Sequence, residues 1–424
     1  MATAGRGCRD GAVRRAARRQ VSDRRAAGRG YTETRLRPRG HDMNATAATG
    51  HPRLAERQQR IARAIRLEPV DRVPVIFMGT AFAPRYMGMT MGHFCRNPDD
   101  GIAVTLDAMD RLGTDAIDGI NHMPGGYITT GLSALWMSRV AVPGLDLPED
   151  TLWQVQEAEV MTIADYDVIL EQGWPAFVQA YLPRVLDPER LAAQRNWARA
   201  NVPGLARRFE ERGYVPVSFA GANLPFELLC GARSMQRFLL DLFRIPDKVQ
   251  AVMEVMQPHM LEAGVAAARY SGVMATWVGG WRSASALLSP RLWERFVFPY
   301  LLDLVTRLLA EGITPVLHFD QDWTRDLSRL RELPAGRCVL NLDGMTDIRK
   351  AHNVLGDHMA IMGDVPSSLL AAGGPQQVRD YVRELVRDVG PTGLLLCPGC
   401  DAPINARPEN MEAFAQASRE FGAG

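Results

Sequence analysis

Short apolar segments of β type alternate with helical segments along most of this chain, and this alternation limits its fold more than any other feature. The candidate strands are short and apolar, and they cover residues 73–79, 114–120, 214–221, 273–280, 313–320, 337–344, 358–365 and 393–400. Helical spacing of apolar residues fills nearly every interval between them. Strands that are separated by helices pair in parallel, and eight such units predict an α/β fold, a closed (β/α)8 TIM barrel.

The interval after the second predicted strand differs from the others. Residues 121–180 contain turn-forming pairs such as Gly125-Gly126 and Pro143-Gly144. Such pairs are typical of loops. We therefore predict an irregular insertion here, which covers one end of the barrel.

The first fifty residues have a composition unlike the rest of the chain. They carry twelve Arg against four acidic residues, a net charge of +8, and almost no apolar periodicity. A segment of this kind cannot bury a core. Three interpretations compete: a disordered tail, a transit peptide, and translated upstream sequence that precedes a real start at Met43. We predict a disordered or spurious Arg-rich extension over residues 1–52 and one barrel domain over residues 53–424.

The other 374 residues carry a net charge of −7 and no basic face, which argues against a nucleic-acid partner. No run of eighteen apolar residues occurs, so the sequence predicts no membrane span. Six unevenly spaced cysteines do not resemble a disulfide framework, and reduced thiols in the cytoplasm are the expected setting. Neither common Gly-rich phosphate motif is present, which disfavours a nucleotide cofactor.

The fifth and eighth predicted strands end in side chains that bind soft or borderline metals. His318 and Asp320 are two residues apart and therefore point to the same side of an extended strand. Cys397 and Cys400 end the eighth strand, and the carboxyl ends of barrel strands converge on one mouth. His, Cys and carboxylate together are a ligand set typical of zinc. The competing interpretation is a strand-end hydrogen bond for His318 and core packing for Cys397.

Six further residues at strand ends are candidates: Asp118, Asp343 and Asp364 as catalytic acids, and Asn223, Trp277 and Trp281 as contacts to a cofactor or a large planar ligand. The acids have an alternative role in hydrogen-bonding loop amides or capping helices. For the two indoles the alternative is packing in the core and loops.

Five short motifs carry a resemblance to a known family. They are Pro69-Val70-Asp71-Arg72-Val73-Pro74-Val75, Phe219-Ala220-Gly221-Ala222-Asn223-Leu224-Pro225, Phe298-Pro299-Tyr300, Ile361-Met362-Gly363-Asp364-Val365 and Gly399-Cys400-Asp401-Ala402-Pro403. As a set, they resemble the uroporphyrinogen decarboxylase superfamily over residues 55–421. That superfamily is built on a (β/α)8 barrel, and the resemblance implies the same fold here.

One branch of this superfamily, the true decarboxylases, uses no cofactor and holds the carboxylates of its substrate with arginines. Its marker, P-x-W-x-M-R-Q-A-G-R-Y, corresponds here to residues 74–86, where Gly79 stands in the position of the first arginine. Loss of that guanidinium removes a bidentate partner for carboxylates, so uroporphyrinogen decarboxylation is disfavoured. Two alternatives are kept: a decarboxylase in which Asp118 or Asp343 polarises the substrate, and a non-catalytic tetrapyrrole-binding barrel.

The other branch comprises zinc methyltransferases that move methyl groups between corrinoid proteins and thiols. Its motif is H-x-C followed much later by Cys; His318 and Cys400 match it, whereas Asp320 replaces the middle Cys. The resemblance implies a Zn²⁺ site at His318 and Cys400, with Asp320 or Cys397 as the third ligand. It also implies a small-molecule methyl donor or acceptor and a partner protein that carries a corrinoid. We therefore predict a zinc-dependent methyltransferase that moves a methyl group to or from a corrinoid protein.

Overall fold

Eight parallel strands follow one another around a barrel in the order of the chain. The structure is a computed structural model, and it describes residues 51–119 and 128–422. The barrel strands are β1 (Ile76–Phe77), β2 (Ala116–Asp118), β5 (Val215–Ala222), β6 (Ala275–Gly280), β7 (Thr314–Phe319), β8 (Val339–Asn341), β9 (Ala360–Val365) and β10 (Leu394–Pro398). A parallel bridge between Val75 and Leu396 joins the last strand to the chain just before the first. The predicted (β/α)8 barrel is thereby confirmed.

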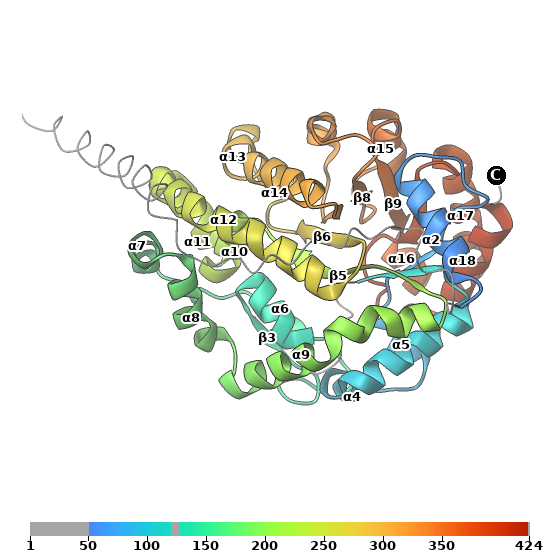
Figure 1. The fold of residues 1–424 in the computed structure, drawn as a ribbon, viewed down its shortest axis with the longest axis horizontal. Coiled ribbons are helices and arrows are strands. Elements are labelled where there is room, and N and C mark those ends of the chain that lie inside the picture. The colour runs from blue at the N-terminus through green and yellow to red at the C-terminus, as the bar shows by residue number, and fades with distance from the viewer. Residues whose placement is uncertain (1–50, 120–127, 423–424) are drawn as a thin grey trace, which may run out of the picture. The chain divides into compact units, whose positions relative to one another are not determined.

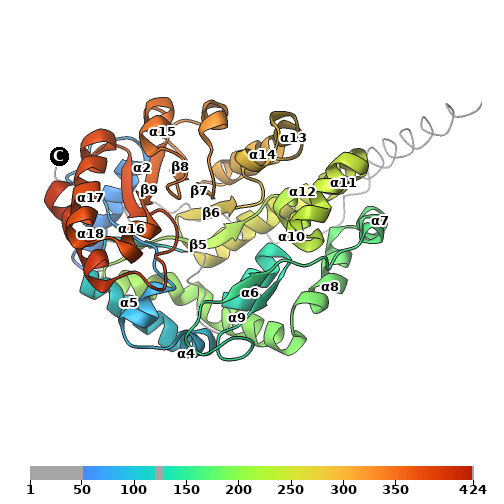
Figure 2. The same ribbon diagram turned by 180° about the vertical axis from the view of Figure 1, so that it is seen from behind.

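Helices surround these strands (Figures 1 and 2). Those before the third barrel strand are α2 (Leu54–Ile65), α3 (Phe82–Tyr86), α4 (Met91–Arg96), α5 (Pro98–Leu112), α6 (Ile128–Trp136), α7 (Ile163–Gln172), α8 (Trp174–Val185) and α9 (Pro188–Glu211). The later ones are α10 (Pro225–Arg233), α11 (Met235–Arg244), α12 (Pro246–Ser271), α13 (Pro290–Phe296), α14 (Phe298–Ala310), α15 (Ile348–Leu355), α16 (Ser367–Ala372), α17 (Pro375–Val389) and α18 (Pro408–Phe421), with short 3-10 helices η2 (Ser285–Leu287) and η3 (Thr324–Glu332).

The insertion after the second strand is more regular than predicted. Its described part contains α6, α7, α8 and a two-stranded antiparallel hairpin of β3 (Arg139–Ala141) and β4 (Gln154–Gln156). The pair Pro143-Gly144 lies in the loop between the two strands of that hairpin. Thr162 and Asp165 form a capping box that starts α7. Pro143-Gly144 therefore marks a connection between two regular elements and not a long irregular loop, whereas Gly125-Gly126 lies outside the described residues.

The helical segment that follows β5 is divided into α10 and α11. Ser234 separates them with a φ of 68°, a conformation that a continuing right-handed helix does not allow. The predicted extension over residues 1–52 lies almost wholly outside the described residues and stays a prediction. None of the helices in the described parts of the chain combines the length and apolarity needed to cross a membrane.

Two apolar layers hold the barrel together. The inner layer consists of alternate residues of the strands, among them Ile76, Val215, Val316 and Val339, packed into one cluster with Ile61 of α2. Helix α2 thus closes the amino-terminal end of the barrel. The outer layer packs the opposite faces of the strands against the surrounding helices, as in other parallel barrels.

A buried carboxylate ties α2 to the first strands. Asp115, just before β2, is fully buried and accepts hydrogen bonds of 2.6 Å from both terminal nitrogens of Arg72 and one of 3.0 Å from the backbone N–H of Val75. Arg57 and Arg60 of α2 each lie 3.3 Å from its Oδ1. Because three guanidinium groups share this one carboxylate, its removal leaves buried positive charge without a partner.

We predict that Asp115→Ala lowers the free energy of unfolding by about 3–5 kcal/mol, because the buried Arg57 loses its acidic partner and Arg60 keeps only its pairs with Glu56 and Asp71. Urea unfolding followed by circular dichroism measures the change. Asp357→Ala is the matched control, since that carboxylate pairs with Arg331 at the exposed surface and its loss should change the stability far less. Equal decreases in the free energy of unfolding of Asp115→Ala and Asp357→Ala would contradict the role of Asp115 as a buried counter-charge.

Candidate metal site

Parallel pairing of the strands places His318 inside the barrel mouth. In the register, His318 of β7 lies opposite Gly279 of β6 on one side and Asn341 of β8 on the other. Val316, two residues earlier, belongs to the inner apolar cluster, and His318 therefore also points inward. The same alternation makes Asp320, two residues further on, the next inward position along the chain.

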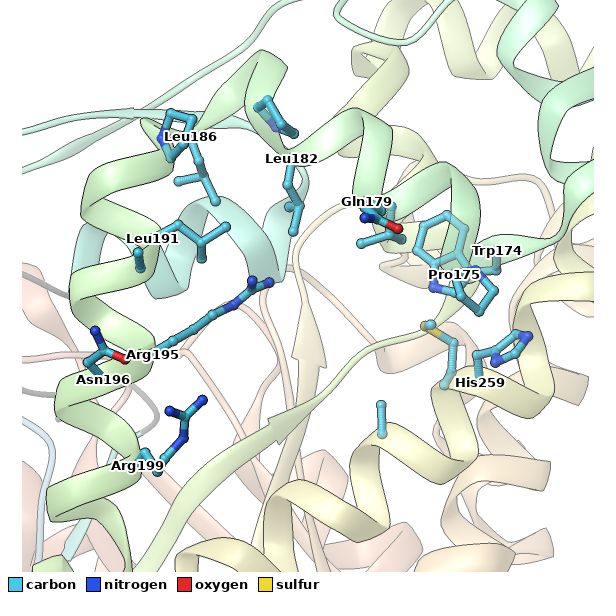
Figure 3. A pocket seen from close by; sticks show the side chains of 16 residues that line it. Trp174, Pro175, Gln179, Leu182, Leu186, Leu191, Arg195, Asn196, Arg199 and His259 are labelled. Atoms are coloured by element: carbon cyan, nitrogen blue, oxygen red, sulfur yellow. The ribbon is translucent and has the colours of Figure 1, made fainter. Parts of the chain in front are cut away.

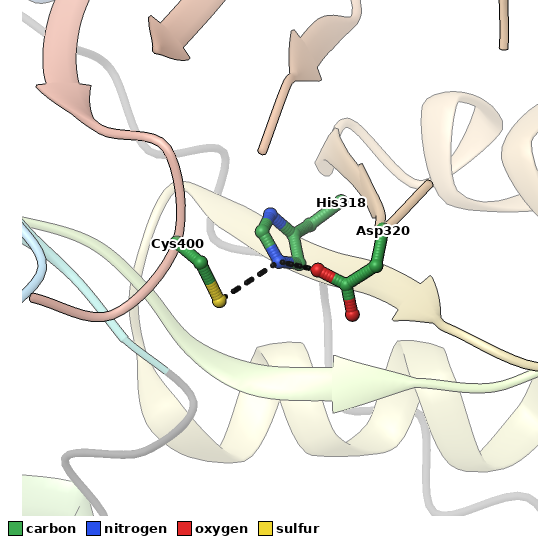
Figure 4. A group of neighbouring side chains, drawn as sticks. All are labelled: His318, Asp320 and Cys400. Carbon is green, nitrogen blue, oxygen red and sulfur yellow. Dashed lines mark hydrogen bonds and ion pairs between the residues drawn. The ribbon is translucent and has the colours of Figure 1, made fainter. Parts of the chain in front are cut away.

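Three side chains converge at this point (Figure 4). Nε2 of His318 lies 3.4 Å from Oδ1 of Asp320 and 3.7 Å from Sγ of Cys400, which follows β10. The candidate ligand atoms of the three residues all lie within 4.8 Å of one another. His318 is buried, with 4% of its surface exposed, whereas Asp320 and Cys400 are partly exposed. Asp320 and Cys400 thus stand on the more open side of the imidazole.

The donor atoms fit a zinc ion. In a tetrahedral site with the usual bond lengths, a histidine nitrogen lies about 3.6 Å from a thiolate sulfur and about 3.4 Å from a carboxylate oxygen. The separations in this protein are 3.7 Å and 3.4 Å. Nitrogen, oxygen and sulfur donors together also suit a metal of borderline softness. Three protein ligands would leave a fourth position open, as in catalytic zinc sites.

Electrostatics at this cluster favour a positive charge. Burial disfavours the charged imidazolium, but the neighbouring Asp320 and Cys400 outweigh it and raise the pKa of His318 well above its usual value. A cluster that attracts a proton so strongly would attract a cation for the same reason.

Cys397, the fourth predicted ligand, lies outside the cluster. Its thiol is fully buried, donates to the carbonyl of Pro398 at 2.9 Å and accepts a hydrogen bond of 3.5 Å from the amide of Asn341. Burial raises the pKa of this thiol well above its ordinary value, which disfavours the thiolate. Of the two residues considered for the third ligand position, the geometry brings Asp320 to His318 and Cys400.

The three predicted acids come from different parts of the barrel: Asp118 lies on β2, Asp364 lies on β9, and Asp343 follows β8. Asp343 accepts backbone hydrogen bonds of 2.8 Å from both Gln321 and Met345, which is the loop-capping role. Asp364 accepts a bond of 2.7 Å from the hydroxyl of Tyr381, and burial raises its pKa to about 7. This carboxyl can hold a proton near neutral pH.

Asp118 is the acid most deeply enclosed in the barrel. Ser218 of β5 donates to its Oδ1, and its Oδ2 has no partner among the described residues. Burial raises the pKa of Asp118 to about 6, and the charge of His318 opposes that rise. Asp118 therefore lies near enough to the imidazole to sense its charge.

Aromatic rings pack beside the cluster. The ring centroids of Trp277 and His318 are 5.7 Å apart, and Trp136 of α6 contacts both Trp277, at 5.9 Å, and Trp281, at 4.9 Å. Trp277 is 5% exposed, so its ring is mainly packed. Asn223 donates to the carbonyl of Leu135, which fastens α6 to the mouth. The insertion is thereby held against the barrel by the indoles and by this amide.

The sequence analysis missed Asn341 and Trp136. Asn341 lies two residues before Asp343 on an inward position of β8, and the alternation of the strand was the signal that could have identified it. Trp136 lies in the segment predicted to be irregular, where no pattern assigned it to a helix. Asp401, next to Cys400, was also unassigned; it accepts backbone hydrogen bonds of 2.8 Å from Thr80 and 3.1 Å from Ala81.

A cavity of about 780 Å³ lies elsewhere, between α8, α9 and α12 (Figure 3). Leu182, Leu186 and Leu191 line it with other apolar side chains, and Arg195 and Arg199 stand on the α9 side. None of the predicted site residues lines this cavity. It is therefore separate from the metal-binding candidates.

Comparison with known proteins assigns the family. Residues 56–123 and 204–421, more than half of the chain, match the family Uroporphyrinogen decarboxylase (URO-D). The chain belongs to the uroporphyrinogen decarboxylase family. This confirms the resemblance to that superfamily. The stretch between the two matched segments contains the insertion elements from α6 to α8.

Several curated relatives are named for the decarboxylase. Uroporphyrinogen decarboxylase of Geobacter metallireducens is 28% identical over 362 residues, which cover 81% of this chain and 93% of that protein. Uroporphyrinogen decarboxylase of Pelobacter propionicus is 30% identical over 338 residues, which cover 76% and 86%. Among solved structures, a methyltransferase from Methanosarcina mazei superposes with a TM-score of 0.63 at 16% identity, over 86% of this chain and 98% of that one. At that identity the likeness shows a shared fold.

We predict that Asp364→Asn gains stability relative to the wild type as the pH rises. The folded protein has a pKa of about 7 at Asp364, above the ordinary value of 3.8, so in that pH window the folded state holds a proton that the unfolded state has released. The free energy of unfolding of the wild type therefore falls as the pH rises. Between pH 5 and pH 8, the difference in unfolding free energy between Asp364→Asn and the wild type should shift by about 2 kcal/mol in favour of the variant.

Urea unfolding at both pH values measures this difference. Asp357→Asn serves as the control, because the pKa of Asp357 is lowered by Arg331 and its carboxylate is ionised throughout the same range. A constant difference between wild type and Asp364→Asn would contradict the raised pKa.

Proposed function

We propose that this protein is a zinc-dependent methyltransferase that moves a methyl group to or from a corrinoid held by a partner protein. The observation that carries the proposal is the cluster of His318, Asp320 and Cys400 at the barrel mouth, whose donor atoms have the spacing of a tetrahedral zinc site. The name of the structural neighbour from Methanosarcina mazei, a methyltransferase on the same fold, supports the same assignment.

In this proposal the three residues hold Zn²⁺, which when bound supplies a Lewis acid with one open position for the heteroatom that gains or loses the methyl group. His318 offers Nε2 from the buried side of the site. Asp320 and Cys400 contribute negative charge from its more exposed side. Trp277 packs beside the imidazole ring of His318, with the ring centroids 5.7 Å apart.

The carboxylate of Asp320 would influence which heteroatom of the substrate the metal activates. A carboxylate in place of a thiolate removes one soft donor and makes the site harder. A harder site is less suited to a thiol acceptor and better suited to an oxygen-methyl substrate. We therefore include a small-molecule methyl donor with oxygen at the reacting position as one form of the proposal. The five described cysteines form no disulfide, which agrees with the reducing, cytoplasmic setting that the proposal assumes.

Uroporphyrinogen decarboxylation is the second candidate, because the curated relatives carry that name. Asp118, with a pKa raised to about 6 by burial, would be the acid that polarises the substrate. The glycine at position 79 argues against uroporphyrinogen decarboxylation. A side chain at Gly79 would place its Cβ 2.6 Å from the ring of Phe77, so the arginine that the decarboxylases carry there does not fit without rearrangement.

We predict that the purified protein binds one zinc ion, and that His318→Ala and Cys400→Ala each abolish stoichiometric binding. The physical reason is the loss of one of three ligands. Zinc content after dialysis under reducing conditions, measured by mass spectrometry, tests this. Cys338→Ala is the control, because this buried thiol lies outside the cluster.

Cys397→Ala provides a sharper comparison, since it removes a thiol near the site but outside the ligand cluster; the variant should still bind zinc. Wild-type protein that binds no zinc and releases CO2 from uroporphyrinogen would contradict the methyltransferase assignment. Metal-free protein that binds a tetrapyrrole without turnover would favour the third function considered, a non-catalytic binding barrel.

We predict further that Asp320→Cys raises the affinity for Cd²⁺ relative to Zn²⁺ by about tenfold or more, because a thiolate is a softer donor than a carboxylate. Competition with a chromophoric chelator measures both affinities in the same variant. Asp320→Asn is the control, as it removes charge without adding sulfur. An unchanged Cd²⁺ to Zn²⁺ ratio would show that residue 320 is not a ligand.

A further inference from the structure

Asn341 is a fully buried amide directly behind His318. It lies on β8 opposite His318 in the strand register, and its Oδ1 lies 2.5 Å from Nδ1 of the imidazole. Nδ1 is the ring nitrogen that faces away from Asp320 and Cys400, because Nε2 faces those two residues. Asn341 therefore contacts the side of His318 that no candidate ligand reaches.

The other end of the amide determines which of its atoms faces the histidine. Nδ2 of Asn341 donates to the backbone carbonyl of Met362 at 3.1 Å. A carbonyl oxygen can only accept, so the NH2 group must be turned toward Met362 and the oxygen toward His318. An oxygen at this position accepts a hydrogen bond, and it follows that Nδ1 of His318 carries a hydrogen. Nε2 is then the nitrogen whose lone pair is available on the side of Asp320 and Cys400.

The second N–H of the Asn341 amide donates to the thiol of Cys397. Nδ2 of Asn341 lies 3.5 Å from Sγ of Cys397, and that thiol donates a hydrogen bond of 2.9 Å to the carbonyl of Pro398. The thiol thus accepts from Asn341 while it donates to the backbone. Both hydrogens of the amide have partners, and the orientation of the side chain is determined on three sides.

We propose that Asn341, supported by the Met362 carbonyl and the Cys397 thiol, is a positioning residue that holds His318 in the Nδ1–H tautomer and presents Nε2 to the metal. This inference rests on the metal binding proposed above, and it assigns Cys397 a supporting role behind the site. Partners of this kind commonly change metal affinity by about 10–100-fold when removed.

The test compares Zn²⁺ affinities of the wild type, Asn341→Leu and Asn341→Asp by competition with a chromophoric chelator. Leucine has a similar size but accepts no hydrogen bond, so we expect about 10–100-fold weaker binding. Aspartate keeps an oxygen that accepts from Nδ1–H, and its affinity should lie closer to the wild type than that of the leucine variant. Equal affinities for the wild type and Asn341→Leu would overturn the proposal.

A second readout does not depend on the variants folding. In wild-type protein with ¹⁵N-labelled histidine and bound ¹¹³Cd²⁺, we expect coupling of cadmium to Nε2 of His318 and a retained proton on Nδ1. Coupling to Nδ1, or loss of that proton, would overturn the inference.

The protonation of His318 in the metal-free wild-type protein distinguishes a failure of this inference from a failure of the proposed function. Nδ1 of His318 should carry its proton there as well, whether or not Nε2 is protonated. Protein that binds neither zinc nor cadmium but keeps the Nδ1 proton would refute the metal-dependent function and retain the hydrogen-bond arrangement. A deprotonated Nδ1 in the metal-free protein would refute the arrangement itself.

Discussion

The parallel register of β6, β7, β8 and β9 is the constraint on which the site depends. It places Gly279, His318, Asn341 and Met362 in one row across the sheet. A shift of one residue would turn His318 out of the barrel and separate it from Asn341. Gly279 belongs to this row for a steric reason, since a Cβ there would lie 2.1 Å from the carbonyl oxygen of His318.

The two ends of the barrel have different roles, one in stability and the other in ligand binding. At the amino-terminal end, Asp115 and its arginines fasten α2 beneath the strands, and apolar residues such as Val316 and Val339 fill the interior above them. At the mouth the inward positions become polar, with His318 and Asn341 on neighbouring strands. Substitutions at the first end should therefore act on stability, whereas those at the mouth should act on ligand binding.

The barrel and part of the site were predictable because both follow from short-range patterns. Apolar runs located all eight strands, and the rule that strand ends carry chemistry selected His318 and Cys400. Asn341 was missed because the predicted strand ran from 337 to 344, which made Asp343 its end, whereas β8 ends at Asn341. The contact of Trp136 with Trp277 joins residues far apart in the chain, and no local pattern encodes such a pairing.

The segment around Gly79, which departs from the decarboxylase pattern, also contacts the loop that carries Cys400. The loop that carries Cys400 is bound to the end of the first strand: Asp401 accepts from the backbone of Thr80 and Ala81, and the backbone N–H of Ala402 donates to the carbonyl of Met78 at 2.8 Å. These bonds flank Gly79, where a Cβ would lie 2.6 Å from the ring of Phe77 and a side chain would require that ring to move. The segment that lacks the arginine for a carboxylate is thus the segment that anchors the thiol-bearing loop. The same few backbone contacts therefore join the position where the arginine is missing to the loop that carries the candidate ligand Cys400.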